Sequence, residues 1–163
     1  SLYLMNKTDM NYVNDLEFLL NKDMDCDDHP EGSDDCTNIY KTKTFEKRKY
    51  KFISRYICIS LSRFENDASG KIKGKKLNNK ILLKDIMDFK TTHKYRLYGA
   101  VCGGGMSGGH YIAYVKSNRK TVEGEVRYKL CDDAAPIGPE VNVKEIWNTT
   151  TRTPYLLFYE RLD

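Results

Sequence analysis

The residues best suited to chemistry lie around a cluster of glycines in the second half of the chain. Six of the eleven glycines fall within residues 99–109, and His110 follows directly. The Gly-x-Gly-x-x-Gly spacing that starts at Gly103 resembles a dinucleotide site, but such a site needs a helix after the glycines. Residues 110–116 instead alternate as a strand does, which excludes that site. An ordinary flexible hairpin loop is one interpretation; a narrow channel for a peptide tail, beside an imidazole that titrates near neutral pH, is the other.

A carboxylate is expected to lie beside this imidazole. If residues 110–116 and 126–132 form an antiparallel hairpin around the intervening turn, His110 lies directly opposite Asp132. Directly opposed side chains leave the sheet on the same face, with Cβ atoms about 4.5–5.5 Å apart. The carboxylate can then accept the imidazole N–H, fix the tautomer and stabilise the imidazolium. Asp133 would point to the other face and is the second choice, unless the strand end bulges.

The elements that must position these residues are predicted to be mainly strands. Alternating apolar residues, rich in β-branched and aromatic types, predict strands at 53–61, 95–102, 110–116, 126–132 and 155–160. Turns at 103–109, 117–125 and 133–140 separate the later strands. This spacing predicts an α+β fold built mostly of antiparallel sheet.

Helices are expected to be few and short. Residues 9–20 predict an amphipathic helix with Val13, Leu16 and Leu20 on its apolar face, and residues 143–147 a short helix or turn. Residues 21–38 and 65–80 are interpreted as surface loops, and the Lys- and Arg-rich residues 41–51 are expected to be solvated. The apolar stretch at 81–89 has no assigned type. Trp147 is expected to pack in the core.

The composition is that of a packed intracellular domain. The chain has 163 residues, of which 40% are hydrophobic and 31% charged, which excludes disordered and low-complexity classes. No apolar run approaches the roughly 20 residues of a membrane span, and no signal peptide is visible. The net charge of +4 does not require a nucleic-acid partner. Five irregularly spaced cysteines without a Cys-x-x-Cys pair favour reduced thiols over disulfides or a zinc ribbon.

Three blocks of the sequence resemble the histidine box of the ubiquitin-specific proteases. They read GGHYIAYV at 108–115, YKLCDD at 128–133 and YLLFYER at 155–161. Upstream, ICISLSRF at 57–64 is similar to the family strand that ends in Leu-x-Arg-Phe. The blocks occur in the family order, with the histidine and the aspartate in register. The resemblance covers residues 50–163 well and residues 1–50 poorly.

The resemblance implies a papain-like cysteine peptidase that cleaves after the C-terminal glycine of ubiquitin. It implies that His110 is the general base for a nucleophilic thiol and that Asp132 orients it. Tyr111 and Phe64 match positions that line the channel for the ubiquitin tail, and the loop that ends at Gly109 matches one that borders it. The implied partner is ubiquitin or a ubiquitin conjugate, in the cytoplasm or nucleus, with no cofactor.

The sequence departs from the family at the nucleophile. The family pattern Gly-Asn-Thr-Cys-Tyr is absent, and none of the five cysteines has a matching context. The sequence also lacks an initiator methionine, so we expect the C-terminal portion of a catalytic domain, over residues 1–163, whose nucleophile-bearing portion is absent. Such a chain is predicted to be inactive alone, with an apolar docking patch near His110 that favours self-association. The alternative is a parent protein that binds ubiquitin without catalysis.

Two weaker patterns concern metals. Asp23-x-Asp25-x-Asp27 begins like a calcium loop, but the sixth position, which must be Gly, is Asp28. Metal ligands could also come from three further side chains, those of Cys26, His29 and Cys36. Relatives that carry zinc in this region use two Cys-x-x-Cys pairs, however, and this sequence lacks both. We therefore expect no metal.

Lysine-rich stretches raise one rival class, a nucleic-acid-binding module. They lie at residues 41–51 and 71–80, and aromatic residues are interleaved with the first of them. Because acidic residues nearly balance the total charge, a solvated surface is the favoured interpretation.

Overall fold

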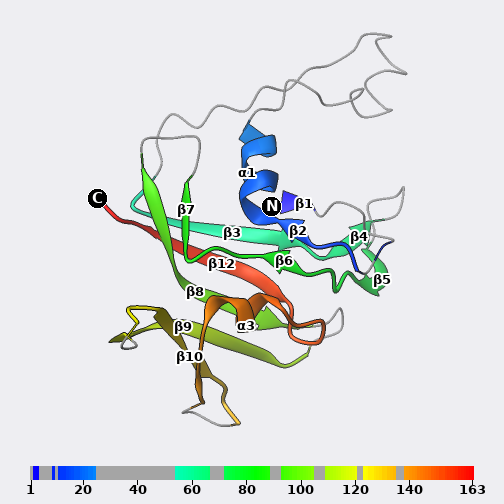
Figure 1. The fold of residues 1–163 in the computed structure, drawn as a ribbon. Coiled ribbons are helices and arrows are strands. Elements are labelled where there is room, and N and C mark those ends of the chain that lie inside the picture. Colours follow the sequence, from blue (N-terminus) through cyan, green and yellow to red (C-terminus); the bar gives the residue numbers. More distant parts are fainter. Residues whose placement is uncertain are drawn as a thin grey trace.

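The computed structural model describes most of the chain after residue 53 and a smaller part before it (Figure 1). The described residues are 2–3, 9, 11–24, 54–66, 72–88, 93–104, 109–120, 123–134 and 138–163. The predictions for Cys26, His29 and Cys36, for the calcium-like run after Asp23 and for the basic stretch at 41–51 lie outside these ranges, as does the middle of the glycine turn.

One eight-stranded sheet organises the described part of the chain. Its order is β1, β3, β12, β8, β9, β10, β11, and β7 pairs with β8. The strands are β1 (Leu2–Tyr3), β3 (Tyr56–Ser62), β7 (Ile86–Asp88), β8 (Lys94–Gly103), β9 (Tyr111–Lys120), β10 (Val126–Cys131), β11 (Glu140–Val141) and β12 (Pro154–Arg161). All its pairings are antiparallel except that of β1 with β3. Figure 1 shows β12 (red) between β3 and β8. The prediction of a mostly antiparallel sheet with few helices is confirmed.

One face of this sheet is buried. In β3, Ile59 and Leu61 are buried, whereas Tyr56 and Cys58 before them are exposed and Ser60 between them is half-buried, as the predicted alternation requires. The buried residues of β12, β8, β9 and β10 belong to the same core. Removing this apolar surface from water is the main stabilising contribution.

Two helices occur among the described residues, α1 (Leu16–Met24) and α3 (Val143–Trp147). Both reach the core, α1 through Leu16 and Leu19, and α3 through Ile146 with Trp147 packed beside it. An Asn142–Glu145 capping box starts α3. Neither helix has the length and apolar composition that crossing a membrane would require.

The predicted start of the first helix is wrong. The chain turns at residues 9–12, where the Tyr12 N–H donates to the Asp9 carbonyl, and β2 (Asn14–Asp15) then pairs with β6 (Ile81–Leu82). The helix begins only at Leu16, because the Asp15 carboxylate accepts the Phe18 N–H at 3.0 Å and so caps it. Val13, expected on the apolar face, lies before the helix and is 40% exposed.

The predicted loop at 65–80 is also wrong in part. It contains a small antiparallel hairpin of β4 (Phe64–Asn66) and β5 (Ile72–Lys76), in which Phe64 pairs with Lys76. The lysines and glycine of β5 give no alternating pattern, so the pairing depends on contacts made after folding. The unassigned stretch at 81–89 contains β6 and β7, with Leu83 buried between them.

The hairpin of β9 and β10 has a different register from the one predicted. Leu130 pairs with Tyr114, and Cys131 with Ala113, so each residue from Tyr128 to Cys131 is matched two positions later along β9 than expected. The turn is correspondingly shorter, with an irregularity between Val126 and Tyr128. Because the side-chain period of a strand is two residues, this offset keeps each side chain on its predicted face.

Candidate active site

His110 lies at the junction between the glycine turn and β9. Gly103 at the end of β8 pairs with Tyr111 at the start of β9, and the Gly104 N–H donates to the His110 carbonyl at 3.1 Å. The backbone of His110 is thereby fixed to β8, while its side chain is 48% exposed. The imidazole is both held and accessible.

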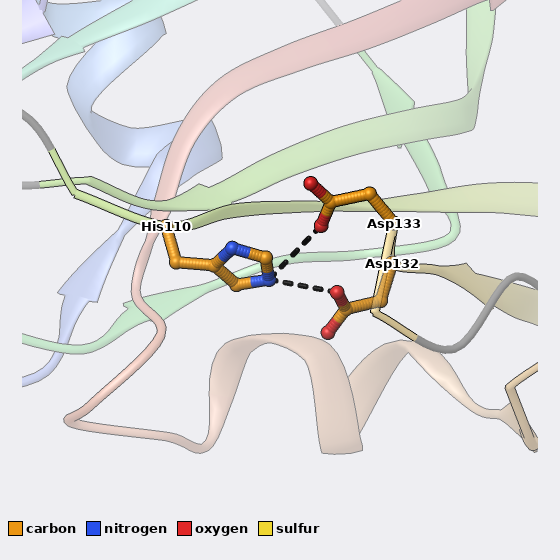
Figure 2. A group of neighbouring side chains, drawn as sticks. All are labelled: His110, Asp132 and Asp133. Atoms are coloured by element: carbon orange, nitrogen blue, oxygen red, sulfur yellow. Dashed lines mark hydrogen bonds and ion pairs between the residues drawn. The ribbon is translucent and has the colours of Figure 1, made fainter.

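Asp132 reaches this imidazole from the end of β10. Its Oδ1 lies 2.7 Å from His110 Nε2, and its side chain is only 10% exposed (Figure 2). The two residues are diagonal rather than directly opposite, because of the two-residue offset, yet they share a face. A diagonal pair lies about 7–8 Å apart at the backbone, within reach of long side chains. His110 and Asp132 are therefore in contact, as predicted, although their pairing is diagonal and not directly opposed.

Asp133 approaches the same nitrogen, which the strand pattern did not predict. Its Oδ1 lies 3.5 Å from His110 Nε2, and its side chain is 85% exposed. Because β10 ends at Cys131 and the chain then turns, strand alternation no longer directs Asp133 to the opposite face. The shorter distance and the lower exposure of Asp132 make it the better partner of the two.

The Asp132 carboxylate is stabilised in its charged form. The Ala134 N–H donates to Oδ1 at 3.1 Å, and this bond, followed by the bond from His110, lowers the pKa of Asp132 below its ordinary value. A carboxylate at neutral pH has no proton to donate, so His110 Nε2 is the donor. Neutral His110 then carries its proton on Nε2 and its lone pair on Nδ1, which can take a proton from another group.

The glycine turn is shaped so that only glycine fits beside His110. Gly103 and Gly104 have φ angles of 99° and 78°, in the left-handed region. A Cβ on Gly103 would lie 2.4 Å from the His110 carbonyl oxygen, and one on Gly104 would lie 2.4 Å from the Tyr111 ring. A strand follows the turn, as predicted, rather than the helix of a dinucleotide site.

The three residues expected to line or border a channel lie around this turn. Gly109 is exposed, and Tyr111 is 48% exposed with its ring 6.5 Å from that of Tyr155. Phe64 is half-buried on β4, and its partner Lys76 contacts the turn through hydrogen bonds to Gly103 and Gly104. The β4–β5 hairpin and the turn are therefore neighbours.

The described cysteines offer no activated thiol. Cys102 is fully buried, and burial raises the pKa of its thiol to about 12 despite the nearby cations, so it stays protonated at neutral pH. Cys58 and Cys131 lie in β3 and β10 as free thiols, Cys58 exposed and Cys131 half-buried. Cys26 and Cys36 lie outside the described residues.

Among the described residues, one group has three potential metal ligands within 4.8 Å of one another: His110, Asp132 and Asp133. The imidazole and Asp132 already satisfy each other by a hydrogen bond. Exposed carboxylates beside a histidine are common without an ion.

Nothing in the sequence indicated that Lys76 and Arg152 lie near this site, and Arg63 was indicated only as part of the Leu-x-Arg-Phe pattern. Lys76, which contacts the turn, lies in a stretch expected to be loop, and Arg152 has Nη1 4.0 Å from Asp132 Oδ2. Arg63 of the Leu-x-Arg-Phe pattern is buried and donates to the carbonyls of Pro154, Leu77 and Asn79. It fastens β12 to the segment after β5, and burial lowers its pKa to about 10.

Solved structures with a similar fold include the SAGA Ubp8/Sgf11/Sus1/Sgf73 DUB module. Its matched chain has a TM-score of 0.60 and 19% sequence identity, over 94% of this chain and 33% of its own. A yeast SAGA DUB module with a mutant Sgf73 has a TM-score of 0.48 and 25% identity, over 67% of this chain and 25% of its own. An essential yeast splicing factor also has 0.48, with 12% identity, over 69% of this chain and 26% of its own. The present chain thus spans about a third of the length of the first matched chain.

The sequence itself was compared with families and with curated proteins. No curated protein matches it significantly. Residues 6–159 match the family described as ubiquitin carboxyl-terminal hydrolase, which agrees with the resemblance to the ubiquitin-specific proteases. Since this match covers nearly the whole sequence, the chain belongs to the ubiquitin carboxyl-terminal hydrolase family.

Proposed function

We propose that this chain is the C-terminal, histidine-bearing portion of a ubiquitin-specific protease catalytic core of papain-like fold. The complete enzyme hydrolyses the thioester, peptide or isopeptide bond after the C-terminal glycine of ubiquitin. His110 is the general base, Asp132 orients it, and Phe64, Gly109 and Tyr111 border the channel for the ubiquitin tail. The observation that carries this proposal is the 2.7 Å contact between His110 Nε2 and Asp132 Oδ1.

The tautomer of His110 determines that Nδ1 is the nitrogen that accepts the thiol proton. A cysteine thiol from the other half gives its proton to His110 Nδ1, and the thiolate attacks the carbonyl carbon of the last glycine. The imidazolium, stabilised by Asp132, then protonates the leaving amine as the thioester acyl-enzyme forms. In the second half-reaction Nδ1 takes a proton from water, the hydroxide attacks the thioester, and the thiol recovers the proton. No cofactor takes part.

The thiol and its side-chain oxyanion donor belong to a second portion of the enzyme. None of the five cysteines lies in the family's nucleophile pattern, so we expect this chain alone to be inactive. Tyr111, the residue directly after His110, is 48% exposed and supplies apolar surface for that portion to cover. An intracellular location fits a thiol enzyme that acts on ubiquitin.

The test is reconstitution. This chain is mixed with a separately expressed cysteine-bearing half of a ubiquitin-specific protease core, and hydrolysis of a ubiquitin–fluorophore amide is measured. We expect hydrolysis from the mixture only, and its loss with His110→Ala. The proposal fails if this chain alone hydrolyses the substrate and loses the activity on mutation of one of its own cysteines.

The alternative is a parent protein that binds ubiquitin without catalysis, and the absence of an activated thiol among the described residues favours it. It predicts that this chain binds ubiquitin while every mixture stays inactive. A nucleic-acid-binding module is the weaker rival, and it predicts steeply salt-dependent retention on single-stranded DNA. Either result replaces the peptidase assignment.

A further inference from the structure

Lys76 is an unusual cation because its partners are backbone carbonyls. Its Nζ donates to the Gly103 carbonyl at 2.7 Å and to the Gly104 carbonyl at 3.0 Å. No carboxylate pairs with it in the described part of the chain. Burial and the nearby Arg63 both lower the pKa of Lys76, so its surroundings disfavour its charge. The two carbonyl contacts compensate for this unfavourable placement.

The two carbonyls belong to the turn that holds His110. On the same residues, the Gly103 N–H donates to the Thr153 carbonyl and the Gly104 N–H donates to the His110 carbonyl, each at 3.1 Å. The turn is therefore tied to β9 and to the start of β12 by its amides and to β5 by its carbonyls. A shift of either glycine would move the backbone of His110.

Lys76 also connects this turn with another part of the proposed channel. It is the register partner of Phe64 in the β4–β5 hairpin. Among the described residues, the side-chain hydrogen bonds from the hairpin to the turn all come from this one ammonium group. The position of Phe64 and the position of His110 are thus linked through a single side chain.

We propose that Lys76 is a positioning residue, which fixes the glycine turn and thereby holds the His110 imidazole on Asp132 in the Nε2–H tautomer. The proposal rests on the proposed function for the role of His110 as base, but the geometry it describes is a property of this chain alone. A neutral side chain at position 76 would leave both carbonyls without this donor and let the turn move.

The experiment follows the imidazole nitrogens by 15N NMR in the 163-residue chain. The chain has three histidines, so His93 serves as an internal reference. We expect the Nε2–H tautomer of His110 in the unmodified chain, and mixed tautomers with faster exchange of the Gly104 amide in Lys76→Met. Lys76→Arg keeps donors for the carbonyls and is expected to restore the single tautomer. Lys80→Met is the matched control, because Lys80 donates to the exposed Asn148 side chain.

Two results would overturn the proposal. One is an unchanged His110 tautomer in Lys76→Met; the other is an equal disturbance of His93, which would mean general destabilisation. If Lys76→Met does not fold, Lys76→Ala, which also removes the ammonium donor, is measured in its place against the same criteria.

Reconstitution separates this proposal from the proposed function. In an active mixture, Lys76→Met should lower kcat roughly 100-fold, the scale of a small misplacement of a catalytic group, and leave KM within about threefold. A raised KM with unchanged kcat contradicts a positioning role. If no mixture is active but the tautomer changes as expected, the peptidase function fails while the positioning role of Lys76 stands.

Discussion

Two histidines contact aspartates in the described part of the chain, and the two pairs differ in what surrounds them. His110 contacts Asp132 beside the glycine turn, whereas His93 contacts Asp163 where β8 starts and β12 has ended. The Asp132 side chain is 10% exposed and is held by the Ala134 N–H, while Asp163 is 54% exposed and shared with Arg161. The exposure of the two histidines differs in the opposite sense, since the His110 side chain is 48% exposed and the His93 side chain 32%.

This difference shows why a His–Asp contact by itself does not identify a site. At His110 the acid is shielded and fixed while the base is open, so a further group can reach the basic nitrogen. At His93 the acid is more than half exposed, an arrangement typical of a surface ion pair of small energetic worth. A shielded acid beside an accessible imidazole is the feature with chemical consequences.

The largest difference is expected between the variant that removes the His110 imidazole and the variant that removes the His93 imidazole. In the reconstituted enzyme, His110→Ala should lower the rate of ubiquitin–amide hydrolysis by roughly 10²–10⁴-fold, because general acid–base catalysis contributes about that much. His93→Ala should change it by less than about twofold. Rates measured at matched protein concentration would contradict the comparison if the two variants lost similar activity.

Next in size is the effect of a methyl group in the glycine turn. Gly103→Ala places Cβ 2.4 Å from the His110 carbonyl, while Gly124, with φ of 76°, has nothing within 4 Å of an added Cβ. Both substitutions carry the backbone cost of about 1–2 kcal/mol for a left-handed L-residue. In urea denaturation, Gly103→Ala should therefore lower the free energy of unfolding by more than Gly124→Ala, and it alone should reduce hydrolysis, by roughly 100-fold. Equal losses in both variants would mean that the turn does not constrain His110.

The two neighbouring acids should differ by less. Asp132→Asn replaces the acceptor of the Nε2–H and should lower kcat by roughly 10–100-fold, the usual scale for a group that orients a reactive side chain. Asp133→Asn, at 3.5 Å and 85% exposed, should change kcat by less than about threefold. A larger loss in Asp133→Asn would reverse the assignment of the orienting acid.

The smallest expected effect is a pH shift. Because the pKa of Asp132 is lowered by Ala134 and His110, its contribution to stability is present above the ordinary value of 3.8 and lost as the pH falls through the folded-state value. A carboxyl 13C titration should give a midpoint below 3.8 for Asp132. In His110→Ala the midpoint should rise only part of the way, because the Ala134 N–H remains. A midpoint at or above 3.8 in the unmodified chain would contradict this account.

Much of the fold could be predicted because alternation is a local signal. The sequence alternation in β3, β8, β9, β10 and β12 runs over enough residues to be recognised, and in β3, β8 and β12 alternate residues are indeed buried. The helix start at Leu16 could not, since the residues just before it pair as β2 with the distant β6, and Asp15 then caps the helix. The β4–β5 hairpin could not be predicted either, because its strands lack alternating apolar residues.

The sequence by itself determined that His110 and Asp132 share a sheet face, because the face depends only on whether the residue spacing is odd or even. It also determined the family, because the motifs can be recognised without knowledge of the strand register. Only the tertiary structure decided which register the hairpin adopts, that Asp133 also reaches Nε2, and that Lys76 contacts the turn. These outcomes depend on a shortened turn, a strand end and a hairpin from a distant part of the chain. Such contacts are fixed by packing between segments, which no local pattern of residues encodes.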